Sequence, residues 1–214
     1  QFRPSHSMNS QYLLRPQNSE FASRKFSPTA ALLLLAALEA SAANWPQWRG
    51  PKGDGISAET DVPVKWSSRE NVAWRTPVPG EGHSSPVVWQ DSVFLTTALS
   101  NSQERLLLRF EARTGKILWQ RPVVTAAVEA MHRENSPASS TPVTDGELVF
   151  TSFQSGKRVD LQAFDFAGQK VWSVQPLEFN GEHGYSYTPL LYRDLLILDC
   201  RQEGEAALLA LDKR

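Results

Sequence analysis

One phrase occurs three times in this chain, with fixed spacing inside each copy. A Ser or Thr followed by Pro opens the copies, at Ser85-Pro86, Thr141-Pro142 and Thr188-Pro189. An acidic residue stands five positions after each proline, and an apolar pair stands seven and eight positions after it. Such a repeat indicates a fold built from similar units placed side by side.

The apolar runs within each copy are short, rich in Val, Leu, Ile and Phe, and bounded by turn residues, which favours strands over helices. Four strands fit each finished copy, and a unit of about 45 to 55 residues with four strands is typical of a propeller blade. We therefore predict an all-β fold, a β-propeller of four-stranded antiparallel blades. The predicted blades cover about 84–121, 140–174 and an unfinished 187–214, roughly three blades of a seven- or eight-bladed ring.

Each finished copy ends with a glycine and, four residues later, a tryptophan: Gly115 with Trp119, and Gly168 with Trp172. The glycines are predicted to supply the positive φ of a tight hairpin. The tryptophans are predicted to fill the wedge between adjacent blades, because their large flat rings bury much apolar surface.

Trp74 stands in the same frame as Trp119, since a proline follows three residues after each. No earlier strands of a blade precede it. We therefore predict a lone strand at 71–77 that pairs with strands from the far end of the ring, so that no sheet edge stays open. Those strands are expected beyond Arg214, which makes the sequence a C-terminally truncated fragment.

The first 42 residues have the features of an export signal. Arg24 and Lys25 precede a short apolar run at about 29–38, and an Ala-x-Ala site places the cleavage near Ala42. The run is too short to span a membrane, which predicts an exported protein, periplasmic or extracellular, without a membrane anchor. The propeller then occupies 43–214. The formal net charge of −1 offers no basic surface for nucleic acid.

Connections between the fourth strand of one blade and the first strand of the next emerge on one face of a propeller. Three such segments, 79–84, 131–136 and 180–185, each carry a His and a Glu. Three His residues on one rim could bind a metal or line a polar pocket, and plain structural loops are the alternative. No metal site is predicted. The candidate residues of the binding face are His83, His132, Arg133, Glu134, Asn135, Glu182 and His183.

The stretches 115–119, 44–51 and 70–77 resemble the PQQ-like repeat propellers, a superfamily that includes quinoprotein alcohol dehydrogenases and BamB-type outer-membrane assembly proteins. The resemblance covers 44–214 and is closest to exported members. The dehydrogenases use an adjacent Cys pair against the quinone and carboxylate and amide ligands for Ca²⁺, whereas this chain has one cysteine, Cys200. The BamB-type lipoproteins carry a lipid-acceptor Cys after the signal, where Ala43 and Asn44 stand here.

These departures favour an exported, non-catalytic propeller that acts as a binding or scaffold module for a protein or saccharide partner. No cofactor is predicted. The alternative is a PQQ-dependent oxidoreductase with Ca²⁺, whose site would depend on further blades. A third hypothesis makes this propeller the sensor module of a hydrolase or kinase that continues beyond Arg214.

Overall fold

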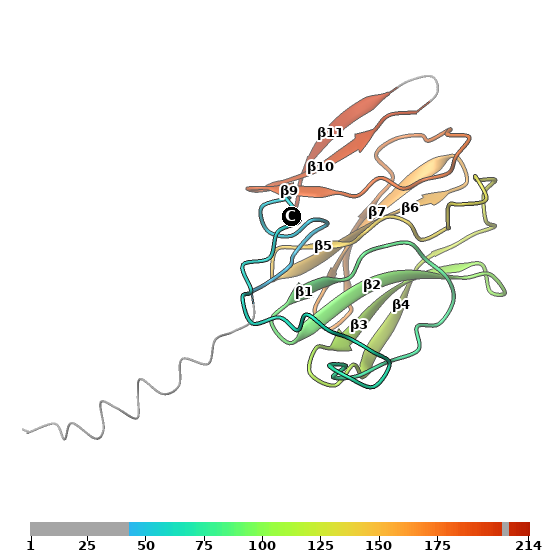
Figure 1. The fold of residues 1–214 in the computed structure, drawn as a ribbon. Coiled ribbons are helices and arrows are strands. Elements are labelled where there is room, and N and C mark those ends of the chain that lie inside the picture. The colour runs from blue at the N-terminus through green and yellow to red at the C-terminus, as the bar shows by residue number, and fades with distance from the viewer. Residues whose placement is uncertain (1–42, 203–205) are drawn as a thin grey trace, which may run out of the picture. The chain divides into compact units, whose positions relative to one another are not determined.

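The computed structural model describes residues 43–202 and 206–214, and these contain strands, turns and loops but no helix. Figure 1 shows three antiparallel sheets that follow one another along the chain. The strands are β1 (Val87–Trp89), β2 (Ser92–Leu99), β3 (Glu104–Glu111), β4 (Ile117–Thr125), β5 (Val143–Thr144), β6 (Leu148–Ser155), β7 (Arg158–Asp165), β8 (Lys170–Val174), β9 (Leu190–Tyr192), β10 (Leu195–Cys200) and β11 (Ala207–Asp212).

The order of strands in each sheet is the order of a propeller blade. The first two sheets run β1-β2-β3-β4 and β5-β6-β7-β8, and the third runs β9-β10-β11. All neighbouring strands are antiparallel, so short turns join them without crossovers. The predicted all-β fold of four-stranded antiparallel blades is confirmed.

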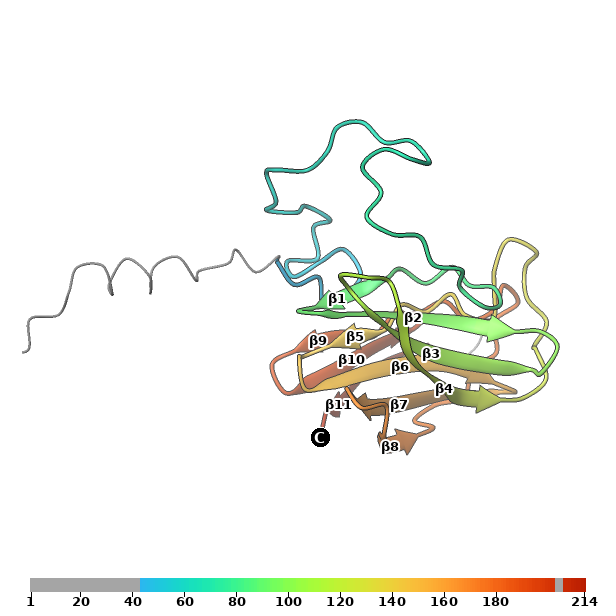
Figure 2. The same ribbon diagram turned by 90° about the horizontal axis from the view of Figure 1, so that it is seen from below.

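Apolar side chains from consecutive sheets share common cores. Phe94 and Leu107 of the first sheet lie in one buried cluster with Val149 and Phe153 of the second. A further cluster joins Phe150 of the second sheet to the third through Leu196. The sheets therefore pack face to face, as the views in Figures 1 and 2 agree.

The Ser or Thr that opens each copy of the repeat has a defined role between blades. The backbone N–H of Ser85 donates to Oγ1 of Thr141 at 2.9 Å, and the N–H of Thr141 donates to Oγ1 of Thr188 at 3.2 Å. Equivalent positions thus form a relay that passes from one blade to the next. The relay gives the hydroxyls of Thr141 and Thr188 a role as acceptors between blades, whereas Ser85 contributes its backbone N–H.

The repeated tryptophans form a second link between units. In each case the indole N–H donates to the carbonyl of the first residue after the third strand of a blade. This residue lies two positions after a Phe or Leu of that strand. The pairs are Trp74 with Ala112 at 2.8 Å, Trp119 with Phe166 at 3.0 Å and Trp172 with Lys213 at 3.0 Å.

Glycine is required beneath two of these rings. Gly115 has φ of 70° and Gly168 has φ of 81°, both in the left-handed region. A β-carbon on Gly115 would lie 2.3 Å from the ring of Trp74, and one on Gly168 would lie 3.1 Å from the ring of Trp119. The hairpin turn and the closely packed indole therefore both select glycine.

The segment 71–77 forms no strand in the described part of the chain, and its pairing with strands from the far end of the ring stays a prediction. Within the described part of the chain, no strand edge pairs with this segment. Side chains hold it instead: Trp74 lies against Gly115, and Oγ1 of Thr76 donates to the Gly115 carbonyl at 2.7 Å. A segment becomes a strand only where a partner edge accepts its backbone hydrogen bonds, and side-chain docking needs no such partner.

The segment around Trp45 braces the innermost strands. Trp45 and Val88 of β1 exchange two backbone hydrogen bonds of 2.8 Å, and the N–H of Thr144 in β5 donates to the Pro46 carbonyl at 2.9 Å. Figure 2 shows the chain leaving this brace in a long excursion before it returns to β1. The brace thereby ties the first two blades together at their inner edges.

The predicted export signal at 1–42 lies outside the described residues. Among the residues that are described, no helix has the length and apolar character needed to cross a membrane.

Candidate functional site

The segments 79–84, 131–136 and 180–185 lie next to one another, and we call this surface the loop face. The N–H of His83 donates to Oγ of Ser136 at 3.1 Å, which joins the first segment to the second. The side-chain amide of Asn135 donates to the His183 carbonyl at 2.7 Å, which joins the second to the third. Asn135 is therefore the central polar link of the face.

His132 and His183 face each other edge to face, with ring centroids 5.6 Å apart and planes at 85°. The N–H of Glu134 donates to Nδ1 of His132 at 3.3 Å, and this bond orients the first ring. The two rings border a cavity of about 350 Å³ that is lined by His132, Glu134, Asn135, His183, Gly184 and Ser186.

Two further cavities adjoin the same loop. One, of about 330 Å³, is lined by Phe179, Gly181, Glu182, His183, Gly184, Tyr187, Arg201 and Gln202. The other, of about 490 Å³, is lined by Glu129, Ala130, Gln154, Gly156, Lys157, Phe179, Asn180, Gly181 and Glu182. The loop 180–184 thus borders all three hollows, and it carries two of the predicted residues, Glu182 and His183.

The remaining predicted residues lie at the margin of this group. His83 contributes its backbone N–H and lies outside the three cavities. Arg133 and Glu134 are exposed and form an ion pair of 3.9 Å with each other, so solvent weakens their attraction. Nowhere in the described ranges do three or more His, Cys, Asp or Glu side chains form a group that could hold a metal ion.

A buried ion pair that sequence reasoning missed fixes one wall of the loop face. Arg105 at the start of β3 is 1% exposed and pairs with Glu129 of the connection after β4. Its guanidinium also donates to the Ala126 carbonyl at 3.2 Å, and Oε1 of Glu129 accepts from the N–H of Gly156 at 2.6 Å. Burial lowers the pKa of Arg105, and the charges of Glu129 and Asp160 oppose that effect.

No signal in the sequence distinguishes Arg105 from an ordinary surface charge. It precedes an apolar run in a strand, and its partner lies 24 residues away. Only the folded connection brings the two together, so a single sequence could not reveal them.

Aromatic side chains on either side of the loop 180–184 pack against one another and so support this loop. Phe179 and Tyr185 pack edge to face at 5.2 Å, and Tyr185 and Tyr187 pack at 5.7 Å. The buried hydroxyl of Tyr185 has no hydrogen-bond partner in the described structure. Burial raises the pKa of Tyr185 well above its ordinary value, and neighbouring Cys200 adds to the rise.

Cys200 belongs to this buried support. Its thiol is free and buried, and burial raises its pKa to about 11, with a further contribution from Asp199. Because the thiolate is the reactive form, Cys200 acts here as an apolar core residue.

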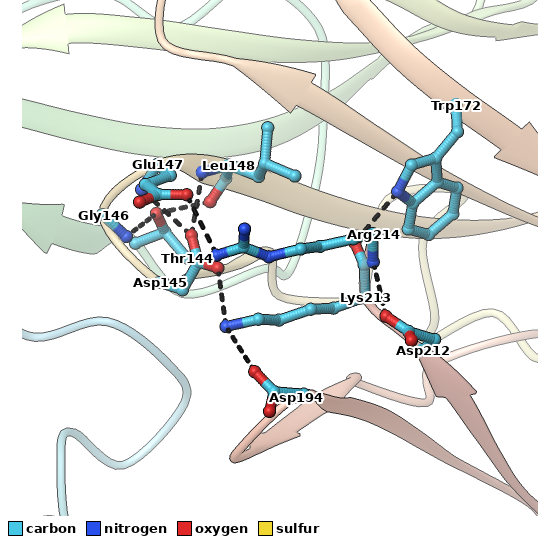
Figure 3. Close-up of polar contacts among 10 residues, drawn as sticks. All are labelled: Thr144, Asp145, Gly146, Glu147, Leu148, Trp172, Asp194, Asp212, Lys213 and Arg214. Carbon is cyan, nitrogen blue, oxygen red and sulfur yellow. Dashed lines mark hydrogen bonds and ion pairs between the residues drawn. The ribbon is translucent and has the colours of Figure 1, made fainter.

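The opposite end of the sheets carries the turns that join the first strand to the second and the third strand to the fourth, and Figure 3 shows a polar cluster there. Nζ of Lys213 lies 3.1 Å from Asp145 and 3.9 Å from Asp194, and so joins the second blade to the third. Burial raises the pKa of Asp145. Hydrogen bonds from the N–H groups of Leu148 and Glu147, together with Lys213, outweigh burial and leave the pKa lowered. These contacts serve the packing of blades.

A protein-family model described as outer membrane protein assembly factor BamB matches residues 57–180. The matched stretch contains the first two blades with their docked tryptophans. The chain belongs to the PQQ-like repeat propeller family. Comparison with curated proteins finds no match.

Solved structures show the propeller fold of this PQQ-like repeat chain. A europium-containing methanol dehydrogenase matches with 15% identity and a TM-score of 0.58, covering 79% of this chain and 30% of its own. BamB from Moraxella catarrhalis matches with 16% identity and a TM-score of 0.46, covering 68% and 41%. A quinohemoprotein alcohol dehydrogenase from Pseudomonas putida HK5 matches with 17% identity and a TM-score of 0.43, covering 65% and 20%. The chain therefore spans less than half the length of each.

Proposed function

We propose that this PQQ-like repeat propeller is an exported, non-catalytic binding or scaffold module whose loop face holds a protein or saccharide partner. The observation that carries the proposal is the clustering of three cavities around one loop, 180–184. A concave surface with a few convergent polar groups is where ligands usually bind. The loop presents Glu182 and His183, and its neighbour presents His132 and Asn135.

The rigidity of the loop face supports a binding role. Arg105 and Glu129 anchor one wall through buried contacts, and Asn135 holds the loop 180–184 through the His183 carbonyl. A surface ordered before binding loses little conformational entropy when its partner arrives. The exposed groups include both donors and acceptors, which suits polar partners.

Export of the protein is supported by two observations. The matching family is described as an outer membrane protein assembly factor. The residues ahead of the propeller have the predicted features of a signal, with a basic start, a short apolar run and an Ala-x-Ala site.

The proposal assigns no quinone cofactor and no metal ion to the residues described. Such a site needs several oxygen or nitrogen ligands around one ion, and no group of three metal-ligating side chains occurs within the described ranges. Cys200 is buried in an apolar cluster and has no second cysteine beside it. The likeness to the methanol dehydrogenase concerns the fold, and it does not assign that protein's activity to this one.

The proposal is tested by cross-linking from two positions in the full-length protein in its native cells. A photoreactive residue replaces exposed Glu182 on the loop face or, as a matched control, exposed Lys116 among the hairpin turns. We expect a defined cross-linked protein or glycan from position 182 only, with its yield reduced at least about tenfold by His183→Ala. Equal products from both positions, or products that His183→Ala leaves unchanged, would contradict the proposal.

A further inference from the structure

Asn180 is the one asparagine in the sequence that precedes a glycine. The other asparagines precede Ser, Trp or Val, and the side chain of each of these hinders the following backbone nitrogen. Glycine has no β-carbon, so its nitrogen can approach the preceding amide carbon with little steric cost. This sequence feature alone makes the Asn180-Gly181 bond chemically distinct.

The local structure leaves both reacting groups free. Asn180 is exposed, and its backbone N–H donates to Oε1 of Gln202. Neither the side-chain amide of Asn180 nor the N–H of Gly181 has a hydrogen-bond partner in the described part of the chain. No hydrogen bond of the Asn180 side chain within the described residues therefore has to break before it turns toward the next nitrogen.

Asn135 on the neighbouring segment shows the opposite arrangement. Its Nδ2 donates to the His183 carbonyl at 2.7 Å, while Oδ1 accepts from the N–H of Ser136 at 2.8 Å and from Oγ of Ser139 at 2.5 Å. The amide is therefore fixed and the following N–H is already engaged. Asn135 provides an internal control on the same face.

We propose that Asn180 is a site of spontaneous modification by deamidation. The nitrogen of Gly181 attacks the side-chain carbon of Asn180, a C–N bond forms, and ammonia leaves with the former side-chain nitrogen. Water then opens the resulting succinimide at either carbonyl, which gives aspartate or isoaspartate. No oxidant or reductant takes part, and the net change is the exchange of NH₃ for H₂O.

The modification changes the loop face in two ways. It adds a negative charge two residues from Glu182, and the isoaspartate form also inserts one methylene into the backbone of the loop 180–184. Because this loop borders all three cavities, both products alter their outline and charge. The chemistry stands apart from the proposed function, whereas any effect on partner binding rests on it.

The test is peptide mapping by mass spectrometry of the full-length protein after ageing in mildly alkaline buffer, with enzymatic methylation to detect isoaspartate. We expect the Asn180 peptide to convert at least about tenfold faster than the Asn135 peptide, and Asn180→Gln to abolish isoaspartate at this position. Conversion at Asn180 that is no faster than at Asn101 or Asn135 would overturn the proposal.

Ageing also separates the modification from the proposed function. If Asn180 deamidates and the cross-linking yield at position 182 does not change, the modification is supported and its effect on partner binding is refuted. Gly181→Ala is not a suitable variant, because a β-carbon there would lie 2.6 Å from the ring of Phe179.

Discussion

Replacing Trp119 tests the contact by which each blade docks on the next. The indole packs against Phe94 with centroids 6.0 Å apart, donates to the Phe166 carbonyl at 3.0 Å and covers Gly168. Trp119→Ala removes all three contacts. The indole then no longer covers the turn at Gly168, so the interface between the first two blades is weakened directly.

The expected cost follows from these contacts. Burial of about half of a ring of roughly 200 Å² contributes about 2.5 kcal/mol, and the aromatic pair adds about 0.5 to 1 kcal/mol. The lost hydrogen bond adds only about 0.5 to 1 kcal/mol, because the Phe166 carbonyl keeps Arg109 as a donor at 2.5 Å. Trp119→Ala should therefore destabilise the protein by about 3.5 to 4.5 kcal/mol, and Trp119→Phe by about 1 kcal/mol.

A double-mutant cycle with Gly168→Ala isolates the docking contact. In the native background, alanine at Gly168 meets both an unfavourable φ of 81° and the indole of Trp119. After Trp119→Ala the backbone cost of about 1 to 2 kcal/mol remains, together with the contact between the β-carbon and Nε of Arg121 at 2.9 Å. Urea unfolding of the full-length protein, followed by far-UV circular dichroism, should give a coupling energy of about 1 kcal/mol or more. Additive effects would refute the docking argument.

Three further predictions concern contacts other than the docked indole. Stability should fall as the pH drops through the lowered pKa of Asp145, since that carboxylate stabilises the fold only while ionised, and Asp145→Asn or Lys213→Met should flatten this acid limb of the pH–stability profile. Thr141→Val should cost about 1 to 2 kcal/mol by leaving the Ser85 N–H without its acceptor, whereas Thr141→Ser should cost less in the same urea assay. Arg105→Met should cost about 3 to 5 kcal/mol because it leaves a largely buried carboxylate without its cation, which a lowered thermal midpoint would report.

The repeated phrase was sufficient to predict the blades, because it records contacts that recur at fixed spacing. The strand pattern and the hairpin glycines at Gly115 and Gly168 depend on neighbours within a few residues, and such signals are visible in one sequence. The lone strand at 71–77 stays a prediction, because strand formation depends on a partner edge and this segment meets none in the described part of the chain.

Contacts between distant segments could not be predicted from the sequence. The relay from Ser85 through Thr141 to Thr188 appears in the sequence only as a preference for a hydroxyl residue. Arg105 and Glu129 meet only after the connection between blades has folded. The three segments of the loop face could be assigned to one surface by topology, but the separation of His83 from the paired rings depends on loop conformation.

The proposal of a binding module is tested most directly by titrating the complete, metal-free protein with pyrroloquinoline quinone in the presence of Ca²⁺ and, separately, of Eu³⁺. The absorption spectrum of the quinone reports its binding. We predict a spectrum equal to that of the free quinone and no quinone retained after gel filtration with either ion. Stoichiometric retention with a shifted quinone spectrum would contradict the non-catalytic account and favour an oxidoreductase.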